Sequence, residues 1–354
     1  MSNVTPKGNY PYPDPSDPVT DYPATASTFA GYVDNLPNRN VIINPFFDIW
    51  QRGTAPATTT SGSYTADRWR LDWDGTAGTR AVSPITPTLG TTIGGMQPYR
   101  AANVNVSTLA TGQSFMRFAQ RIESVRSLAG ETATLSLYVS STVAPKTVTI
   151  RAVQNFGTGG SPSSAVTTTI GTATTTTSYA RQIYTFTVPA LTGKTMGTNG
   201  DDYLEIHFDL GTQTGTFNFW GVQLEQNTTA TALERRPIQQ ELDLCHRYFE
   251  AYLGTEGILF PQAPINADSG NRPEIMLFYK AKRVGPTITV SSVGHITCES
   301  PTSGASGVST LFATYVGTGT RASNIFFAMT WSVNVPAYAF FNTTAGYIHI
   351  SAEL

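Results

Sequence analysis

The sequence is short of charge, cysteine and long apolar runs, and each shortage excludes a class of protein. Only 13% of its 354 residues are charged and the formal net charge is −2, which excludes a strongly basic nucleic-acid-binding protein. Two cysteines, Cys245 and Cys298, cannot build a disulfide framework or a zinc cluster. Two free, buried thiols are favoured over one bridge between them. No window approaches the roughly 18 apolar residues of a membrane-spanning helix, so no membrane insertion is expected.

Uncharged residues with β and turn preferences fill the place of the missing charges. Threonine is abundant, and there are 31 glycines and 22 prolines. Threonine suits the pleated surface of a sheet, whereas glycine and proline mark turns. Aromatic residues make up 11% of the chain, enough to form hydrophobic cores. The composition therefore predicts an all-β protein and excludes a helical bundle.

Residues 1–38 form a separate, proline-rich segment. The stretch YPYPDPSDP at 10–18 favours an extended, polyproline-like chain without internal hydrogen bonds. Two interpretations stay open: a flexible tail, or an arm that docks onto a partner protein at little entropic cost. The first ten residues have no apolar stretch typical of a secretory signal.

Residues 39–232 are predicted to form a β-sandwich. Apolar segments lie at 41–43 and 46–50, on either side of an Asn-Pro turn signal. Apolar and polar residues then alternate along six segments, as in strands with one solvated face. These segments are residues 115–122, 133–139, 148–153, 182–188, 203–210 and 216–224. The threonine-rich stretch 161–178 is expected to be an exposed loop or hairpin.

Residues 233–254 are predicted to contain one connector helix, over 237–253. Proline suits the first helical position, and apolar residues recur after it at spacings of three and four. This stripe consists of Ile238, Leu242, Cys245, Phe249 and Tyr252. It is too short to hold helices together alone. One interpretation places the helix across its own sheet, and the other makes the stripe an interface of a homo-oligomer.

Residues 255–354 return to strand patterns and predict a C-terminal β-sandwich-like domain. Strand-like segments include 274–279, 287–291, 324–333 and 347–352. The region carries little charge, and weakly charged sheet edges tend to pair with other chains. A permanent oligomer is the expected way of protecting these edges.

The sequence offers little for catalysis, so no enzymatic activity is expected. Its four histidines are scattered and lack metal-ligand spacing, and neither a nucleophile elbow nor a phosphate-binding loop is present. His207 and His349 lie within strand alternation, where a structural, hydrogen-bonded histidine is the better interpretation.

One short segment concentrates aromatic and charged side chains. Residues 64–74, YTADRWRLDWD, combine a tyrosine, two tryptophans, two arginines and three aspartates. Aromatic faces beside carboxylates and guanidinium groups suit sugar rings. The candidate carbohydrate-binding residues are Tyr64, Arg68, Trp69, Arg70, Asp72 and Trp73. The same alternation equally fits tryptophans in the core, with an ion-pair ladder on the opposite face.

Several stretches resemble a family of tail-associated proteins of tailed bacteriophages, and half of the chain resembles carbohydrate-binding modules. The arm at 10–18 is similar to N-termini of phage tail fibre and minor tail proteins. The other similar stretches are NVIINPFFDIWQRG at 40–53, YTADRWR at 64–70, GVQLE at 221–225 with ERRP at 234–237, ELDLCHRYFE at 241–250 and ISAEL at 350–354.

The resemblance implies a non-enzymatic virion structural protein of the tail fibre or adhesin type, made in the host cytoplasm and located in the phage tail rather than the head. Residues 1–38 would dock onto other virion proteins, and the chain would form a homotrimer. Residues 39–232 would be a carbohydrate-binding-like jelly roll that binds a host-surface glycan. A structural Ca²⁺ ion, held by Asp48 and Glu225, is also implied. The alternatives are a head fibre or decoration protein of the capsid, and a bacterial carbohydrate-binding protein attached to an unrecognised hydrolase.

Overall fold

The computed structural model describes residues 3–4, 11–12, 38–56, 58, 60–256, 259–260, 274–300, 304–307, 310–315, 322–328 and 338–354. The chain divides into two compact units. The first unit consists of Met1–Asp48, Thr58–Ser63 and Arg70–Pro237. The second consists of Ile49–Ala57, Tyr64–Trp69 and Ile238–Leu354. The second unit therefore includes two short segments from the region expected to belong wholly to the jelly roll.

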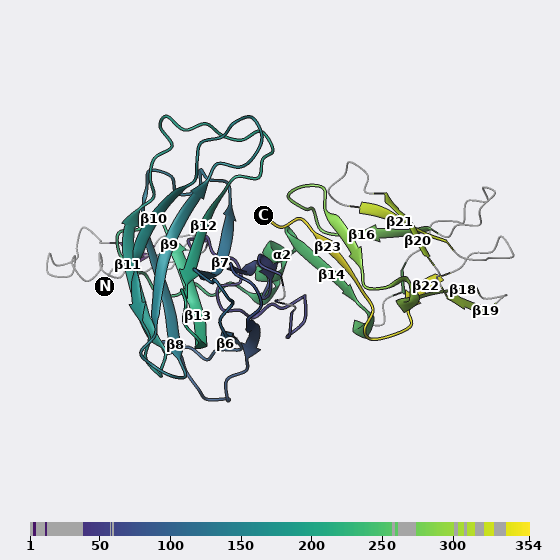
Figure 1. Ribbon diagram of the computed structural model, residues 1–354, viewed down its shortest axis with the longest axis horizontal. Helices are drawn as coiled ribbons and strands as arrows, with labels where there is room; N and C mark the ends of the chain where they lie inside the picture. The colour runs from purple at the N-terminus through teal and green to yellow at the C-terminus, as the bar shows by residue number, and fades with distance from the viewer. Residues whose placement is uncertain are drawn as a thin grey trace. The chain divides into compact units, whose positions relative to one another are not determined.

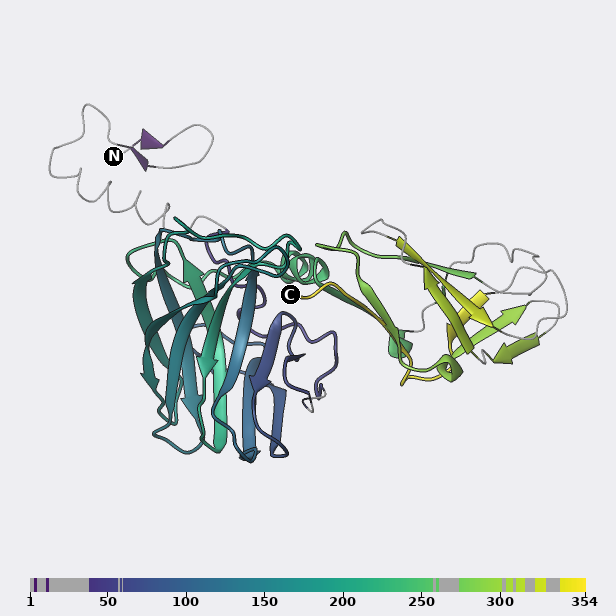
Figure 2. The same ribbon diagram turned by 45° about the horizontal axis from the view of Figure 1, so that its top comes forward.

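The first unit is a sandwich of two antiparallel sheets (Figures 1 and 2). The six-stranded sheet has the order β10 (Val166–Thr174), β9 (Thr147–Asn155), β12 (Tyr203–Asp209), β7 (Met116–Glu123), β4 (Trp69–Trp73) and β3 (Ser63–Tyr64). The five-stranded sheet has the order β11 (Ala180–Thr187), β8 (Thr132–Ser141), β13 (Gly215–Glu225), β6 (Ala101–Thr108) and β5 (Thr79–Ile85).

The order of the strands makes this sandwich a jelly roll. Along the chain, successive strands from β6 to β13 cross between the two sheets, except for the hairpin β9–β10, which stays in one sheet. The result is two four-stranded sets, β6-β13-β8-β11 and β7-β12-β9-β10, which is the double Greek key of a jelly roll. The predicted fold is confirmed, and the threonine-rich stretch forms the outer strand β10 of that hairpin.

The core lies between the two sheets and is formed by every second residue of each strand. On β12, Leu204, Ile206 and Phe208 are fully buried, and Phe208 stacks on Phe219 of the facing sheet with ring centroids 5.1 Å apart. The opposite face of β12 carries polar residues. Two of them, Glu205 and His207, are also buried, at 7% and 1% exposure. Polar side chains that are covered on the outer face of a sheet indicate a recess there.

Two predicted segments of the first unit are not regular strands. Residues 41–43 and 46–50 lie in bends, turns and irregular chain. The first segment and Pro45 nevertheless bond to the last strand of the jelly roll, because the Val41 amide donates to the Leu224 carbonyl at 3.0 Å and the Val222 amide donates to the Pro45 carbonyl at 3.1 Å. Most of the arm, residues 1–38, lies outside the described residues; β1 (Asn3–Val4) pairs with β2 (Pro11–Tyr12).

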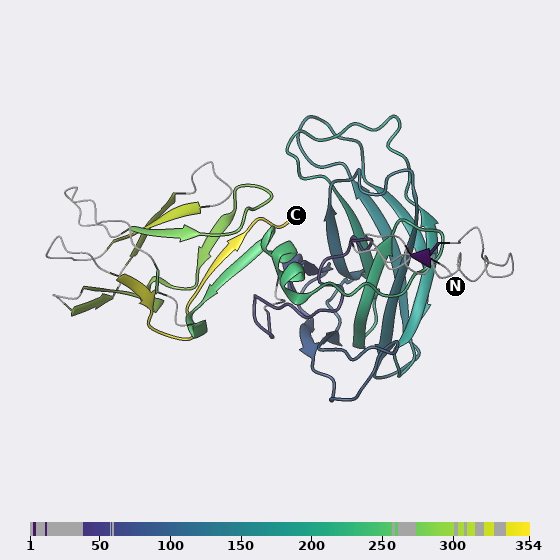
Figure 3. The same ribbon diagram turned by 180° about the vertical axis from the view of Figure 1, so that it is seen from behind.

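The connector helix is shorter than the prediction. Helix α2 spans Ile238–His246, and the chain turns at Arg247 and Tyr248 into strand β14 (Phe249–Leu253), which pairs with β23 (Tyr347–Ser351) (Figures 1 and 3). Phe249 and Tyr252 are therefore strand residues. Pairing with a strand almost a hundred residues away overrides the local helical spacing, which the sequence alone cannot reveal.

The apolar stripe is partly covered within its own unit. Cys245 is a free thiol at 0% exposure and Phe249 is 2% exposed, so neither can meet a second copy of the chain. Ile238 is 59% exposed, and Leu242 and Tyr252 are half-buried. Cys245 and Phe249 therefore pack within their own domain, as one of the two interpretations of the stripe expected.

The remaining strands of the second unit form small antiparallel sheets with the orders β14-β23-β17, β15-β22-β18-β19 and β16-β21-β20. Their bounds are β15 Leu259–Phe260, β16 Glu274–Phe278, β17 Thr287–Val290, β18 Ile296–Ser300, β19 Gly304–Gly307, β20 Thr310–Tyr315, β21 Ala322–Ala328 and β22 Tyr338–Phe341. The C-terminal region is all-β, as predicted. Among the described residues, no helix has the length and apolar character needed to cross a membrane.

Candidate functional site

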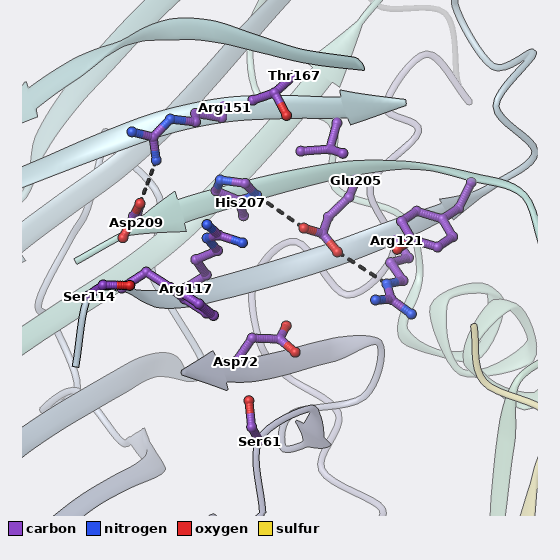
Figure 4. A pocket seen from close by; sticks show the side chains of 13 residues that line it. Ser61, Asp72, Ser114, Arg117, Arg121, Arg151, Thr167, Glu205, His207 and Asp209 are labelled. Atoms are coloured by element: carbon purple, nitrogen blue, oxygen red, sulfur yellow. Dashed lines mark hydrogen bonds and ion pairs between the residues drawn. The ribbon is translucent and has the colours of Figure 1, made fainter. Parts of the chain in front are cut away.

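A polar cleft of about 510 Å³ lies on the outer face of the six-stranded sheet (Figure 4). Side chains from β4, β7, β9, β10 and β12 line it, joined by residues of two neighbouring loops. The lining residues are Ser61, Asp72, Ser114, Phe115, Arg117, Arg121, Arg151, Val153, Thr167, Tyr203, Glu205, His207 and Asp209. Strand alternation explains the set, because the same strands send their apolar residues into the core.

The centre of the cleft is a pair of residues on β12. His207 Nδ1 lies 3.0 Å from Glu205 Oε1. Burial by itself would raise the pKa of Glu205, but the hydrogen bond and charge of His207, together with Arg121, outweigh burial and lower it. Glu205 is therefore a carboxylate, and it accepts a hydrogen bond from Nδ1–H of His207. His207 Nε2 is buried and has no hydrogen-bond partner in the described part of the protein.

Two arginines on either side of β12 pair with its carboxylates. Arg121 Nε donates to Glu205 Oε2 at 3.1 Å, and Arg151 Nη1 pairs with Asp209 Oδ2. The strand register produces these pairs. Glu205 lies directly opposite Arg121 on β7. Arg151 on β9 lies opposite His207, and Asp209 is the next residue after His207 on the same face of β12. Cross-strand charge pairs of this kind stabilise an exposed sheet face only modestly.

A third arginine has no such carboxylate. Arg117 forms no ion pair with any described residue, and its Nε is buried without a hydrogen-bond partner. Its guanidinium carbon lies 4.0 Å from the centroid of the Phe115 ring, and that of Arg121 lies 4.1 Å from the Tyr203 centroid. The cleft therefore combines two aromatic rings, paired charges and two polar groups that still lack partners.

The structure places one of the six predicted carbohydrate-binding residues in this cleft. Asp72 lines it and is held by Arg70, whose Nε and Nη2 donate to the two carboxylate oxygens at 2.8 and 2.5 Å. This pair is the ion-pair ladder of the alternative interpretation. Arg70 supports Asp72 and is absent from the lining of the cleft.

The two tryptophans lie in the core. Trp69 is 0% exposed and Trp73 is 8% exposed, with the Arg80 guanidinium carbon 4.2 Å from the Trp73 centroid. Their rings therefore cannot serve as exposed platforms for a sugar. The sequence pattern allowed either exposed tryptophans that bind a sugar or tryptophans in the core. The structure has them in the core, because the apolar face of β4 is buried.

Tyr64 and Arg68 belong to a different polar group, in the second unit. Arg68 has a φ of 71°, so the chain turns there before β4 begins, and the side chain is 1% exposed. It pairs with Glu353 and stacks on Tyr248, 3.5 Å from the ring centroid. The Tyr64 hydroxyl donates to the Leu354 carbonyl at 2.8 Å. Both residues therefore hold the second unit together.

The closed cluster, as we call it, consists of Gln51, Arg52, Asp67, Arg68 and Glu353. Arg52 Nη2 donates to Glu353 Oε1 at 3.1 Å, and the Gln51 amide donates to Asp67 Oδ1 at 3.0 Å. The other oxygens of the two carboxylates meet Arg68 and the Gln51 side chain. Burial raises the pKa of Asp67 against the opposing effects of Arg52 and Gln51.

Asp48 and Glu225 do not fit the calcium ion that the resemblance implies. Glu225 accepts hydrogen bonds from the Thr231 amide and hydroxyl and from Gln223, at 2.7–2.9 Å. Asp48 accepts from the Arg100 amide at 3.2 Å and faces Arg235. Carboxylates that are already bonded to donors and cations are poor Ca²⁺ ligands. Across the described ranges, no three His, Cys, Asp or Glu side chains gather as a metal site.

Sequence reasoning missed most of the cleft. Its central residues, Tyr203, Glu205, His207 and Asp209, were visible as the polar face of an alternating strand. The prediction that His207 is hydrogen-bonded is confirmed for Nδ1, while Nε2 is buried without a hydrogen-bond partner among the described residues. The arginines come from strands that the sequence separates widely, so only the strand order brings them together.

Comparison with known proteins finds loose structural likenesses. No family model matches the chain, and no curated protein matches it. A tailspike protein domain of bacteriophage CBA120 is similar at 16% identity and a TM-score of 0.33, over 53% of this chain and 22% of that one. This chain therefore covers about a fifth of that tailspike domain.

Two carbohydrate-binding modules show likeness of the same degree. A family 11 module from Clostridium thermocellum, solved with a mixed-linked tetrasaccharide, is 13% identical, with a TM-score of 0.31 over 51% of this chain and 97% of the module. A CBM22-1 xylan-binding domain from Paenibacillus barcinonensis is 11% identical, with a TM-score of 0.30 over 48% of this chain and 92% of the domain.

Proposed function

We propose that the protein binds a glycan in the cleft of the six-stranded sheet and does not transform it. The observation that carries this proposal is the unpartnered Nε2 of His207, 1% exposed as a residue, in a recess lined by paired charges. A buried polar atom without a partner is costly unless a ligand supplies one. The recess size of about 510 Å³ lies within the range of small-molecule sites.

The chemistry of the lining suits sugar hydroxyls. Carboxylates and guanidinium groups accept and donate hydrogen bonds in fixed directions, as vicinal hydroxyls require. Tyr203 and Phe115 offer aromatic surface for the C–H face of a sugar ring. A row of surface ion pairs alone would explain Arg121 and Arg151, but it would leave His207 Nε2 without a role.

The test is binding of the full chain to an array of bacterial surface oligosaccharides, followed by calorimetry on the ligands that bind. His207→Gln should weaken binding about tenfold, since one hydrogen bond inside a desolvated site is lost. His295→Gln, a matched substitution in the second unit, should leave binding unchanged. Melting temperatures of both variants establish that they fold.

The proposal fails if no oligosaccharide binds, or if His207→Gln and His295→Gln bind equally well. Should His207→Gln fail to fold, Tyr203→Ala provides the second test, because Tyr203 is only half-buried. Release of new reducing ends from a bound oligosaccharide would contradict the non-enzymatic part of the proposal.

We further propose that the protein is a virion structural protein of a tailed bacteriophage, of the tail fibre or adhesin type, and that glycan binding serves attachment to the host. The support is the resemblance of residues 10–18 and 40–53 to phage tail proteins. Residues 1–38 would dock onto the particle. Deleting residues 1–36 should leave a folded protein that binds glycan but is missing from purified particles, as measured by mass spectrometry. Normal incorporation of the truncated chain would contradict the docking role.

We also propose that the chain assembles as a homotrimer. The support is the same resemblance, together with the exposed Ile238 on α2 and the weakly charged strands of the second unit. Light scattering of the full chain should give three times the monomer mass. A monomer or dimer contradicts this proposal and leaves the glycan-binding proposal in place.

A further inference from the structure

The lining of the cleft holds three arginines and three carboxylates, and Arg70 adds a fourth arginine from outside the lining. The three carboxylates each face an arginine: Glu205 faces Arg121, Asp209 faces Arg151, and Asp72 is held by Arg70 from outside the lining. Arg117 remains: it forms no ion pair with any described residue, and Asp209, which lies opposite it on β12, is paired with Arg151. Because the acids are already occupied, the cleft presents one uncompensated positive charge to a ligand.

The surroundings of Arg117 hold its guanidinium group in place for a partner. The group lies against Phe115, at 4.0 Å from the ring centroid, and the residue is half-buried. A partly desolvated cation gains a partner when an anion binds beside it, which favours an anionic ligand at this position. A guanidinium group donates two parallel hydrogen bonds, a geometry that matches a planar carboxylate.

His207 adds a second polar group beside this cation. Because Nδ1 of His207 is hydrogen-bonded to the Glu205 carboxylate, Nε2 is the ring nitrogen left for a ligand hydroxyl. Arg117 on β7 lies opposite Asp209 on β12, and His207 is the next residue along β12 on the same face. Such diagonal positions are roughly 7–8 Å apart, close enough for two groups of one sugar ring.

We propose that the cleft is selective for an acidic glycan, in which Arg117 binds the carboxylate of a uronic acid and His207 Nε2 forms a hydrogen bond with a hydroxyl of the same sugar residue. Figure 4 shows both side chains projecting into the cleft, with the Glu205 contact that orients His207. This inference rests on the proposed glycan-binding function and names the class of glycan.

The test compares matched ligands. Hexasaccharides of galacturonic, glucuronic and mannuronic acid are each titrated against the full chain beside their carboxyl-reduced, neutral counterparts. At least one acidic hexasaccharide should bind about tenfold or more tightly than its neutral counterpart. Arg117→Gln should bring that ratio close to one while the affinity for the neutral sugar stays unchanged.

Two variants control for charge and shape. Arg126→Gln removes the same charge from an exposed turn and should leave both affinities as they are. Arg117→Lys keeps the charge but loses the planar fork, and it should retain only part of the preference. Melting temperatures confirm that each variant folds.

Each other outcome overturns the inference in a recognisable way. Binding of neutral and acidic sugars with equal affinity, lost in His207→Gln, rejects the acidic selectivity and keeps the proposed function. Binding of a glycerol phosphate polymer, dependent on Arg117 and without uronate binding, rejects the carboxylate in favour of a phosphate. No binding of any sugar rejects both proposals.

Discussion

The closed cluster of the second unit and the cleft of the first unit are built from the same residue types and differ in one respect. Both contain arginines that pair with buried carboxylates. In the closed cluster, the carboxylates bind the guanidinium groups of Arg52 and Arg68, whose faces also stack on Phe249 and Tyr248. In the cleft, Arg117 Nε and His207 Nε2 have no hydrogen-bond partner in the described part of the protein.

This difference separates a structural role from a binding role. A buried charge whose partner is present within the protein contributes to the folded state, and its removal leaves the partner uncompensated. A polar group without a partner gives little to stability and becomes useful only when a ligand arrives. Residue type alone does not distinguish the two, because arginine and glutamate are central to both.

The closed cluster should respond most strongly to loss of a charge. Arg68→Gln leaves Glu353 buried beside only one arginine, and we expect the free energy of unfolding to fall by about 3–5 kcal/mol. Urea unfolding measures this change. Replacing both partners, as Arg68→Met with Glu353→Leu, should recover much of the loss. If Arg68→Gln lowers the free energy of unfolding by less than the exposed control Arg126→Gln does, the ion pair of Arg68 with Glu353 does not contribute to stability.

Trp73→Ala should destabilise the first unit by about 3 kcal/mol, because a nearly fully buried indole is removed and a cavity remains. Tyr99→Ala, at an aromatic residue that is 62% exposed, is the control and should leave the melting temperature almost unchanged. The opposite result, an unchanged melting temperature with weaker glycan binding, would return Trp73 to the role of a sugar platform.

Acidification should weaken the second unit through His349. Burial, together with the charge of Arg52, lowers the pKa of His349 from 6.5 to about 4. Between these values the unfolded chain binds the proton and the folded chain does not, so this contribution to stability declines as pH falls from 6.5 to about 4. His349→Gln should reduce the difference in melting temperature between pH 7 and pH 4.5. An unchanged difference would assign the acid sensitivity to other groups.

Arg117→Gln should have the smallest effect on stability, within about 0.5 kcal/mol, although it is the same substitution as Arg68→Gln in the closed cluster. The reason is that Arg117 has no internal partner to leave behind. Urea unfolding of the two variants side by side tests the comparison directly. If Arg117→Gln lowers the free energy of unfolding as much as Arg68→Gln does, Arg117 has a structural role rather than a binding role.

The sequence predicts individual strands better than it predicts contacts between distant parts of the chain. The alternation of residues 203–210 was enough to predict strand β12 and to separate its apolar face from its polar face, because strand periodicity is a local property. Local patterns fail after helix α2. Phe249 and Tyr252 continue the helical spacing that begins at Ile238, but they lie in strand β14, because pairing with β23 outweighs the local pattern.

The amino-acid sequence by itself determined that this protein is all-β, that its first large domain contains alternating strands with one polar face, and that residues 64–74 contain tryptophans suited to one face of a strand. Those properties depend on composition and on neighbours within a few residues. Only the tertiary structure decided that Trp69 and Trp73 face the core, that Arg68 meets Glu353, and that Arg117, Arg151 and His207 share one cleft. The physical reason is that the partners in these contacts come from strands far apart in sequence, which only the jelly-roll strand order and the folding of the second unit bring together.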